Sequence, residues 1–192
     1  NLRYAQSDIL TLAELGSSFD IIECSGVLHH MQDPLAGWRA LVDLLKPEGL
    51  IKIGLYSELA RQSISKARAD IASLQIKATA AEIRAFRQQV AASSENPHRE
   101  LTSFNSFYSL SEFRDLVFHV QEHQFTIPKI QDSLEELGLA FCGFEYDTKN
   151  LPKFEKFFPH NRDIYDLERW HELERSNPDT FRGMYQFWCQ RY

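Results

Sequence analysis

The sequence predicts an α/β protein built around a parallel sheet, and three observations support this fold class. Short segments at 20–26 and 50–55 carry apolar residues without a helical period and are bounded by turn residues, as strands are. Segments whose apolar residues recur every three or four positions separate the strand-like segments. The apolar and charged fractions, 43% and 25%, are those of an ordinary folded domain. Strands that alternate with helices indicate an α/β sheet.

The first 56 residues predict one strand-helix-strand unit. Strands at 20–26 and 50–55 suit the interior of a parallel sheet. Asp33 and Pro34 form a helix start signal, and 46–49 (Lys-Pro-Glu-Gly) predict the end of that helix. Its apolar residues at helical spacing are Trp38, Leu41 and Leu45. We expect the crossover between the two strands to be right-handed.

The middle of the chain predicts helices. Residues 58–94 are rich in alanine and predict one or two of them, and 111–123 predict another. The apolar face expected in the first region is made of Ile64, Ala67, Ile71, Leu74, Ile83, Phe86 and Val90.

The last third predicts a helix from Pro128 that ends at Gly138, and then two strands at 139–146 and 184–190. Between these strands, 161–175 predict a polar helix with a narrow apolar stripe. The charged residues near the end of that helix are expected to face solvent.

Composition and charge exclude several classes of partner. The net charge of -6 argues against a surface that binds nucleic acid or anionic lipid. No apolar stretch approaches the roughly 20 residues of a membrane-spanning helix, and no signal peptide is visible. Three widely spaced cysteines, Cys24, Cys142 and Cys189, fit reduced thiols rather than a disulfide framework. We therefore expect a cytoplasmic protein whose partner is a small molecule or another protein.

Four short motifs follow one another before Tyr56. They are Ser7-Asp8-Ile9-Leu10, Phe19-Asp20-Ile21-Ile22, Val27-Leu28-His29-His30 and Leu45-Lys46-Pro47-Glu48-Gly49-Leu50. In this order they resemble class I S-adenosylmethionine-dependent methyltransferases. The resemblance implies a Rossmann-like methyltransferase sheet, incomplete at its N-terminal side, with helical insertions. It also implies that ligands bind beyond the carboxyl ends of the strands, which is the general rule for open α/β sheets.

The resemblance implies roles for the residues around the expected first strand. Asp8 matches the acidic residue that accepts a hydrogen bond from the adenine amino group, with Ile9 beside it, although Asp8 could also simply cap a turn. The residues that would line the cofactor after the strand are Ser25, Gly26, Val27 and Leu28. His29 and His30 follow at the methyl-transfer face. They could shape the pocket, or one could act as a general base or, least favoured, bind a metal.

One family feature is absent from the sequence. The eight glycines are never closer than five residues apart, so no tightly spaced glycine turn exists to approach a nucleotide. The acidic residue that would hold the ribose is also missing. We expect the chain to be the C-terminal part of a longer enzyme, to bind cofactor poorly and to be inactive alone. The open edge at 20–26 would be covered by the missing N-terminal half or by a second copy.

The motifs divide the chain into three parts. Residues 1–56 would be the partial core, from the end of the third strand through the fifth, and 57–126 a helical insertion that forms a lid or substrate region. Residues 127–192 would hold the last core helix and closing strands, with an insertion at 148–180. The run Phe107–His119 also resembles a segment of bacterial methyltransferases that are sometimes fused to helical repeats.

Candidate substrate-pocket residues are Tyr56, Tyr108, Arg114 and His123, with His119 as another candidate base. The expected reaction is methyl transfer from S-adenosylmethionine to an unidentified small molecule or protein. A non-catalytic methyltransferase-like interaction module is the alternative from another class.

His119, Glu122 and His123 also match the H-x-x-E-H pattern of inverted zinc proteases, in which both histidines lie on one helical face. Such a site needs a third protein ligand, for which Glu168 and Glu172 are candidates. A zinc hydrolase is therefore a second, less favoured alternative, and no metal is assigned.

Overall fold

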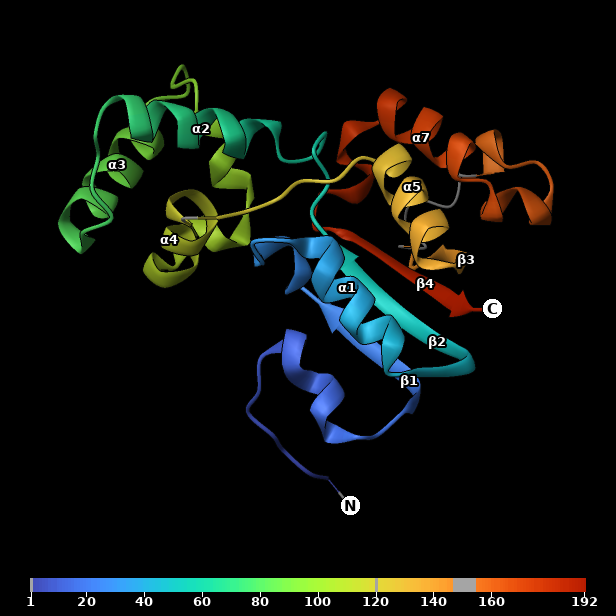
Figure 1. Cartoon of the computed structure of the whole chain (residues 1–192). Helices are drawn as coiled ribbons and strands as arrows, with labels where there is room; N and C mark the ends of the chain where they lie inside the picture. The colour runs from blue at the N-terminus through green and yellow to red at the C-terminus, as the bar shows by residue number, and fades with distance from the viewer. Residues whose placement is uncertain (1, 120, 147–154) are drawn as a thin grey trace. The chain divides into compact units, whose positions relative to one another are not determined.

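The computed structural model describes residues 2–119, 121–146 and 155–192. The chain divides into two compact units (Figure 1). One comprises Asn1–Ala60 and Glu122–Tyr192 and contains the sheet, and the other comprises Arg61–Gln121 and is helical. Part of the expected insertion at 148–180 lies outside the described residues. Among those that are described, no helix combines the length and apolar character that crossing a membrane requires.

The first unit is built on a four-stranded sheet with the order β1-β2-β4-β3. Its strands are β1 (Phe19–Ser25), β2 (Leu45–Leu55), β3 (Leu139–Phe144) and β4 (Tyr185–Arg191). Strands β1 and β2 are parallel, whereas β4 runs antiparallel to both of its neighbours. The predicted α/β class is confirmed, and the two late strands form the antiparallel closing pair.

The helix α1 (Pro34–Asp43) connects β1 to β2. Its predicted start is confirmed, since the Asp33 carboxylate accepts hydrogen bonds from the backbone N–H groups of Leu35 and Ala36. Its predicted end is wrong. Leu45 belongs to β2 and pairs with Phe19.

Residues 46–49 form an irregularity inside β2 rather than a helix stop. The β1–β2 register jumps from Phe19↔Leu45 to Ile21↔Leu50, and Glu48 adopts a positive φ of 61°. The extra residues of β2 are taken up at this left-handed position before regular pairing resumes at Leu50. The prediction failed because proline and glycine also mark strand irregularities.

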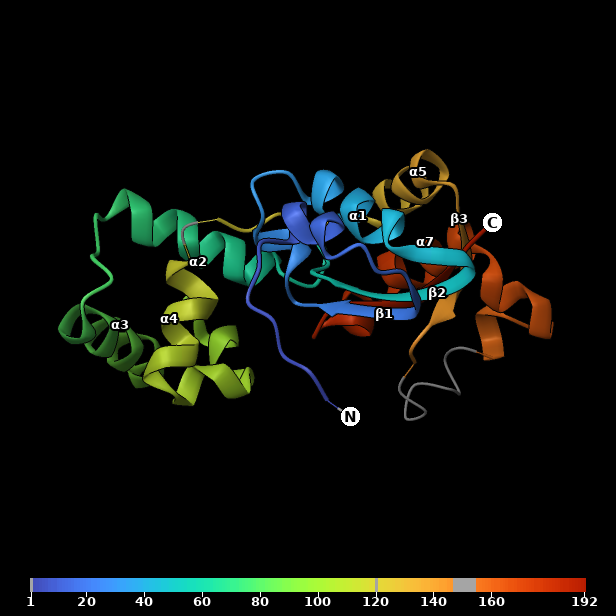
Figure 2. The ribbon, with the colours of Figure 1, turned by 60° about the horizontal axis from the view of Figure 1, so that its bottom comes forward.

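One face of the sheet is covered by helices. Helices α1 and α5 (Ile127–Leu137) lie side by side along it, as both views show (Figures 1 and 2). Ile51, Ile53 and Leu55 of β2 are fully buried in this core. Gly138 ends α5 in the left-handed conformation, so the predicted cap is confirmed.

The opposite face of the sheet carries polar side chains. The Lys52 ammonium lies 3.2 Å from a carboxylate oxygen of Glu23 and 3.0 Å from one of Glu145. It therefore links β1 to the residue that follows β3. Its pKa is raised by the Glu145 and Glu23 carboxylates. The indole N–H of Trp188 donates to Glu145 at 3.2 Å.

The remainder of the first unit follows β3. It contains the short 3-10 helices η6 (Asn161–Tyr165) and η7 (Pro178–Phe181), with α7 (Leu167–Ser176) between them. Leu167 and Trp170 are buried, as the predicted stripe requires.

The second unit has a core of its own. It contains α2 (Gln62–Ser73), α3 (Ala80–Ala92), η3 (Arg99–Ser103), η4 (Asn105–Tyr108) and α4 (Leu110–Phe118). The predicted face of α2 and α3 is buried except for Leu74, which is 69% exposed because α2 ends at Ser73. The two cores share no buried residue among those described.

Candidate functional site

The carboxyl ends of β1 and β2 bring several predicted residues together. Gly26 follows β1 directly and turns the chain with a φ of 75°, a conformation that favours glycine. Its N–H donates to the Gly54 carbonyl at 3.4 Å, which keeps the turn close to β2. A Cβ built on Gly26 meets no atom within 4 Å. Open space therefore borders this turn at the edge where ligands of such sheets bind.

An aromatic cluster lies just beyond this turn. The 3-10 helix η2 (Leu28–His30) carries His29 and His30, whose ring centroids are 4.3 Å apart. The ring of Tyr56, the residue after β2, lies 3.9 Å from His29 at an interplanar angle of 33°. His29 is fully buried and His30 is half-buried. The structure thus brings two candidate bases and one candidate pocket residue into contact.

A backbone segment crosses this cluster and fixes it. The His123 N–H donates to the His29 carbonyl at 2.7 Å, and the Phe125 N–H donates to the Tyr56 carbonyl at 2.9 Å. The Phe125 carbonyl in turn accepts from the Glu58 N–H at 2.9 Å. His123 lines a cavity of about 210 Å³ next to Trp38 of α1. The predicted pocket residues Tyr56 and His123 therefore belong to one hydrogen-bonded arrangement around His29.

The residues expected to line the cofactor differ in accessibility. Val27 is 43% exposed and Ser25 is also exposed, so both can contact a ligand. Leu28 is fully buried in the core.

Asp8 begins the 3-10 helix η1 (Ile9–Leu15), which packs against α1. Its Oδ1 accepts the Leu10 N–H at 2.9 Å, so the capping role is present. The beginning of η1 lies toward the carboxyl end of β1 (Figure 1). Asp8 is exposed and Ile9 half-buried. The adenine contact stays a prediction.

The remaining predicted residues belong to the helical unit. The Tyr108 hydroxyl donates to the Thr102 carbonyl at 3.0 Å, and its side chain is mostly exposed. Arg114 lines a cavity of about 430 Å³ together with Ile83 and Leu110. His119 Nε2 lies 3.9 Å from an Asp115 carboxylate oxygen.

The prediction that His119 and His123 lie on one helix, as a zinc site of this kind would need, is wrong. The helix α4 ends at Phe118, whereas the sequence predicts it to continue to about His123, and His119 has extended backbone angles. His119 and His123 therefore do not share a helical face. No group of three or more His, Cys, Asp or Glu side chains within 2–119, 121–146 and 155–192 is arranged to hold a metal ion.

The cysteines are free thiols in the described structure. Burial raises the pKa of Cys24 to about 11 and also raises that of Cys189. Their thiols are therefore protonated near neutral pH and behave as small apolar groups.

A cluster that sequence reasoning missed lies at the same end of the sheet. Glu174 of α7 is completely buried, although the sequence predicts a solvated helix face there. Its carboxylate accepts hydrogen bonds from Ser57 at 2.5 Å and from Tyr185 at 2.7 Å. The signal was present, because Glu174 follows Leu167 and Trp170 at helical spacing on the buried face.

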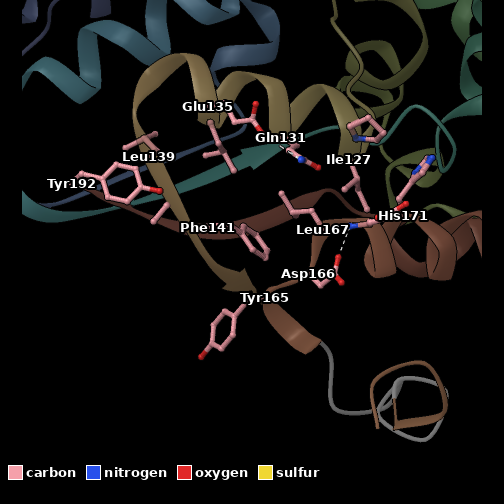
Figure 3. Close-up of a pocket in the computed structure, with 14 residues that line it drawn as sticks. Ile127, Gln131, Glu135, Leu139, Phe141, Tyr165, Asp166, Leu167, His171 and Tyr192 are labelled. Carbon is pink, nitrogen blue, oxygen red and sulfur yellow. Dashed lines mark hydrogen bonds between the residues drawn. The ribbon is translucent and has the colours of Figure 1, made fainter. Parts of the chain in front are cut away.

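A separate groove of about 760 Å³ lies where α5, β3 and the η6–α7 region meet (Figure 3). Phe141, Tyr165 and Tyr192 contribute aromatic rings to it, and Glu135 and Glu168 contribute carboxylates. None of the residues predicted as cofactor contacts, substrate-pocket residues or candidate bases lines this groove, whereas Glu168, named above as a possible third zinc ligand, does. This groove and the residues predicted to bind the cofactor and the substrate therefore mark different places.

Comparisons with known proteins support the motif assignment. Residues 1–53 match the family model of a methyltransferase domain. A protein of Synechococcus sp., named uncharacterized protein syc1184_c, is 31% identical over 150 residues, which are 74% of this chain and 36% of that protein.

Two solved structures share the fold. PKMT2 from Rickettsia typhi has a TM-score of 0.64 at 14% identity, and its complex with AdoHcy has a TM-score of 0.63 at 16% identity. Each comparison covers 95% of this chain and 37% of the solved chain. The chain thus spans little more than a third of the length of these relatives. Residues 1–53 are thus similar to a methyltransferase domain, and the chain shares the fold of these two solved structures.

Proposed function

We propose that the chain contributes to S-adenosylmethionine-dependent methyl transfer to a small molecule or protein. The main support is that the family match and the candidate site lie in the same part of the chain. The residues that match the methyltransferase family, 1–53, form the β1–α1–β2 unit whose carboxyl edge holds Gly26 and the His29–Tyr56 pair. Open α/β sheets bind their ligands at this edge.

The residues present fit an adenosyl cofactor. Open space next to Gly26 allows a ligand to approach the backbone, and the exposed Ser25 and Val27 flank it. Oδ2 of Asp8 makes no hydrogen bond within the described part of the chain, so it can accept one from an adenine amino group. Because the tightly spaced glycine turn is absent from this sequence, we expect the chain alone to bind the cofactor weakly.

When bound, S-adenosylmethionine supplies a methyl group on a positively charged sulfur. The role of this chain would be to orient the methyl acceptor for in-line displacement and to exclude water. The closely packed, mutually tilted rings of His29 and Tyr56 provide a wall for that purpose. His30, which is partly accessible, is the better placed of the two adjacent histidines to remove a proton from an acceptor.

We also propose that another strand covers β1, which is an edge of the described sheet. Ile21 is 60% exposed and Phe19 40% exposed, and an apolar edge of this kind favours pairing. Polypeptide outside this chain or a second copy would supply the strand. If pairing is the whole role of this edge, the chain is an interaction module, which is the alternative function.

The proposal is tested by titrating the chain with S-adenosylhomocysteine, followed by nuclear magnetic resonance. We expect binding in the millimolar range for the wild type and a clear loss for Asp8→Ser. Serine keeps the helix cap but is too short to reach adenine. The control is Asp43→Ser at the exposed end of α1, which should bind like the wild type. Equal affinity of all three proteins would exclude the adenine role, and absence of binding would favour the interaction module.

A further inference from the structure

Glu174 is an ionisable group buried without a counterion at the ligand edge of the sheet. It is 0% exposed, and within the described residues its carboxylate forms no ion pair. Its hydrogen bonds come from two hydroxyl groups, those of Ser57 and Tyr185. Burying a carboxyl in this way opposes stability unless every lone pair is used well. A costly arrangement of this kind points to a role beyond packing.

Both hydroxyl donors lie at one edge of the sheet. Tyr185 begins β4 and pairs with Leu55 at the end of β2, and Ser57 follows β2 by two residues. The Ser57 hydroxyl also accepts the Ala60 N–H at 3.1 Å, so its position is fixed from two sides. Glu174 thereby connects α7 to the carboxyl end of β2.

This connection continues into the His29–Tyr56 cluster. Ser57 is the neighbour of Tyr56, and the backbone around it is bonded to Phe125 on both sides, through the Tyr56 carbonyl and the Glu58 N–H. The Tyr56 ring lies against His29. Because one peptide unit joins Tyr56 to Ser57, a shift of Ser57 also moves Tyr56 relative to His29.

We propose that Glu174 is a positioning residue of the methyl-transfer site, which holds Ser57 in place and thereby sets the Tyr56 ring against His29. The inference rests on the proposed function, since the His29–Tyr56 wall is where the acceptor would be oriented. Glu174 itself, being fully buried, does not touch the substrate. A sub-ångström shift of an orienting group is enough to slow transfer.

The test compares the chain with Glu174→Gln and with Glu172→Gln, which replaces an exposed carboxylate on the same helix. Nuclear magnetic resonance follows the imidazole signals of His29 and its ring contacts with Tyr56. We expect Glu174→Gln to shift the His29 signals and weaken those contacts, while strand signals at the opposite end of β2 stay in place. Glu172→Gln should leave all of them unchanged.

A second pair of variants keeps the test decisive if Glu174→Gln does not fold. Ser57→Ala breaks the connection to Tyr56 and should move His29, whereas Tyr185→Phe leaves the Ser57–Glu174 bond and should not. An unchanged His29–Tyr56 contact in Ser57→Ala, and in Glu174→Gln if that variant folds, would show that Glu174 only anchors α7, and would overturn the proposal.

S-adenosylhomocysteine is added to the same samples as the probe of the proposed function. If His29 moves in the variants but the wild type shows no response to this probe, the coupling stands and the methyltransferase role fails. If the wild type binds the probe and His29 does not move, the role stands and the positioning inference fails.

Discussion

Glu174 loses all contact with solvent on folding, and this makes the stability of the chain depend on pH. Burial raises the pKa of Glu174 above its ordinary value of 4.5, the nearby Glu58 raises it further, and the Ser57 and Tyr185 hydroxyls oppose the shift. Above pH 4.5 and up to the raised value, the folded chain holds a proton that the unfolded chain has lost. Stability therefore decreases as pH rises through this interval.

The measurement is urea unfolding of the wild type, Glu174→Gln and Glu172→Gln at a series of pH values from 4.5 upward. Glutamine does not titrate, so the free energy of unfolding of the wild type relative to Glu174→Gln should fall as pH rises. The Glu172→Gln difference should stay flat, since that carboxylate is exposed. A pH-independent difference for Glu174→Gln would mean that its carboxyl titrates normally.

Some residues of the site were predicted from the sequence and others were not. His29, Tyr56 and His123 were each named from the sequence, and they lie together because β1, β2 and the 122–125 segment end at one edge. Glu174 was missed because a charged residue on a polar helix normally faces solvent. Its hydroxyl partners are 117 and 11 residues away in the chain, and no local pattern predicts such contacts.

At the scale of the elements, the close approach of β1 and β2 beneath the site depends on Gly54. A Cβ added there would lie 2.9 Å from the Cα of Ser25 and 2.8 Å from the sulfur of Met184. The Ser25 backbone cannot move without disturbing its pairing with Gly54 in the β1–β2 ladder.

Gly54→Ala should therefore lower the free energy of unfolding by about 1–3 kcal/mol, the usual cost of overpacking a filled core. The matched control is Gly183→Ala, where an added Cβ meets nothing within 4 Å. Chemical denaturation of both variants measures the difference. Equal stability of the two would show that the strands can separate at this point without cost.

Elements were predicted best where one local signal decided them. The capped starts of α1 and α5 and the glycine end of α5 follow from side chains within a few residues. Boundaries set by distant pairing were predicted wrongly. Leu45 joins β2 because Phe19 is there to pair with it, and α4 ends at Phe118 although its apolar pattern continues.

For the whole molecule, the ordered motifs of the first 56 residues predicted a methyltransferase-like domain, in agreement with the match of residues 1–53, whereas no motif predicted the substrate. The first motif begins η1, and the other three occupy turns or strand ends of the β1–α1–β2 unit. The helical unit has a separate core, and its sequence shows only that such a core exists. Expected roles of Tyr108 and Arg114 at the substrate therefore stay predictions.

We propose that an adenosyl ligand binds at the carboxyl edge of β1 and β2. The most direct measurement is the map of amide signals of the labelled chain that respond to millimolar S-adenosylhomocysteine. We predict responses confined to Asp8–Leu10, Ser25–His30 and Tyr56. Responses at the groove between α5 and α7, with none at the carboxyl edge of β1 and β2, would contradict binding at this edge.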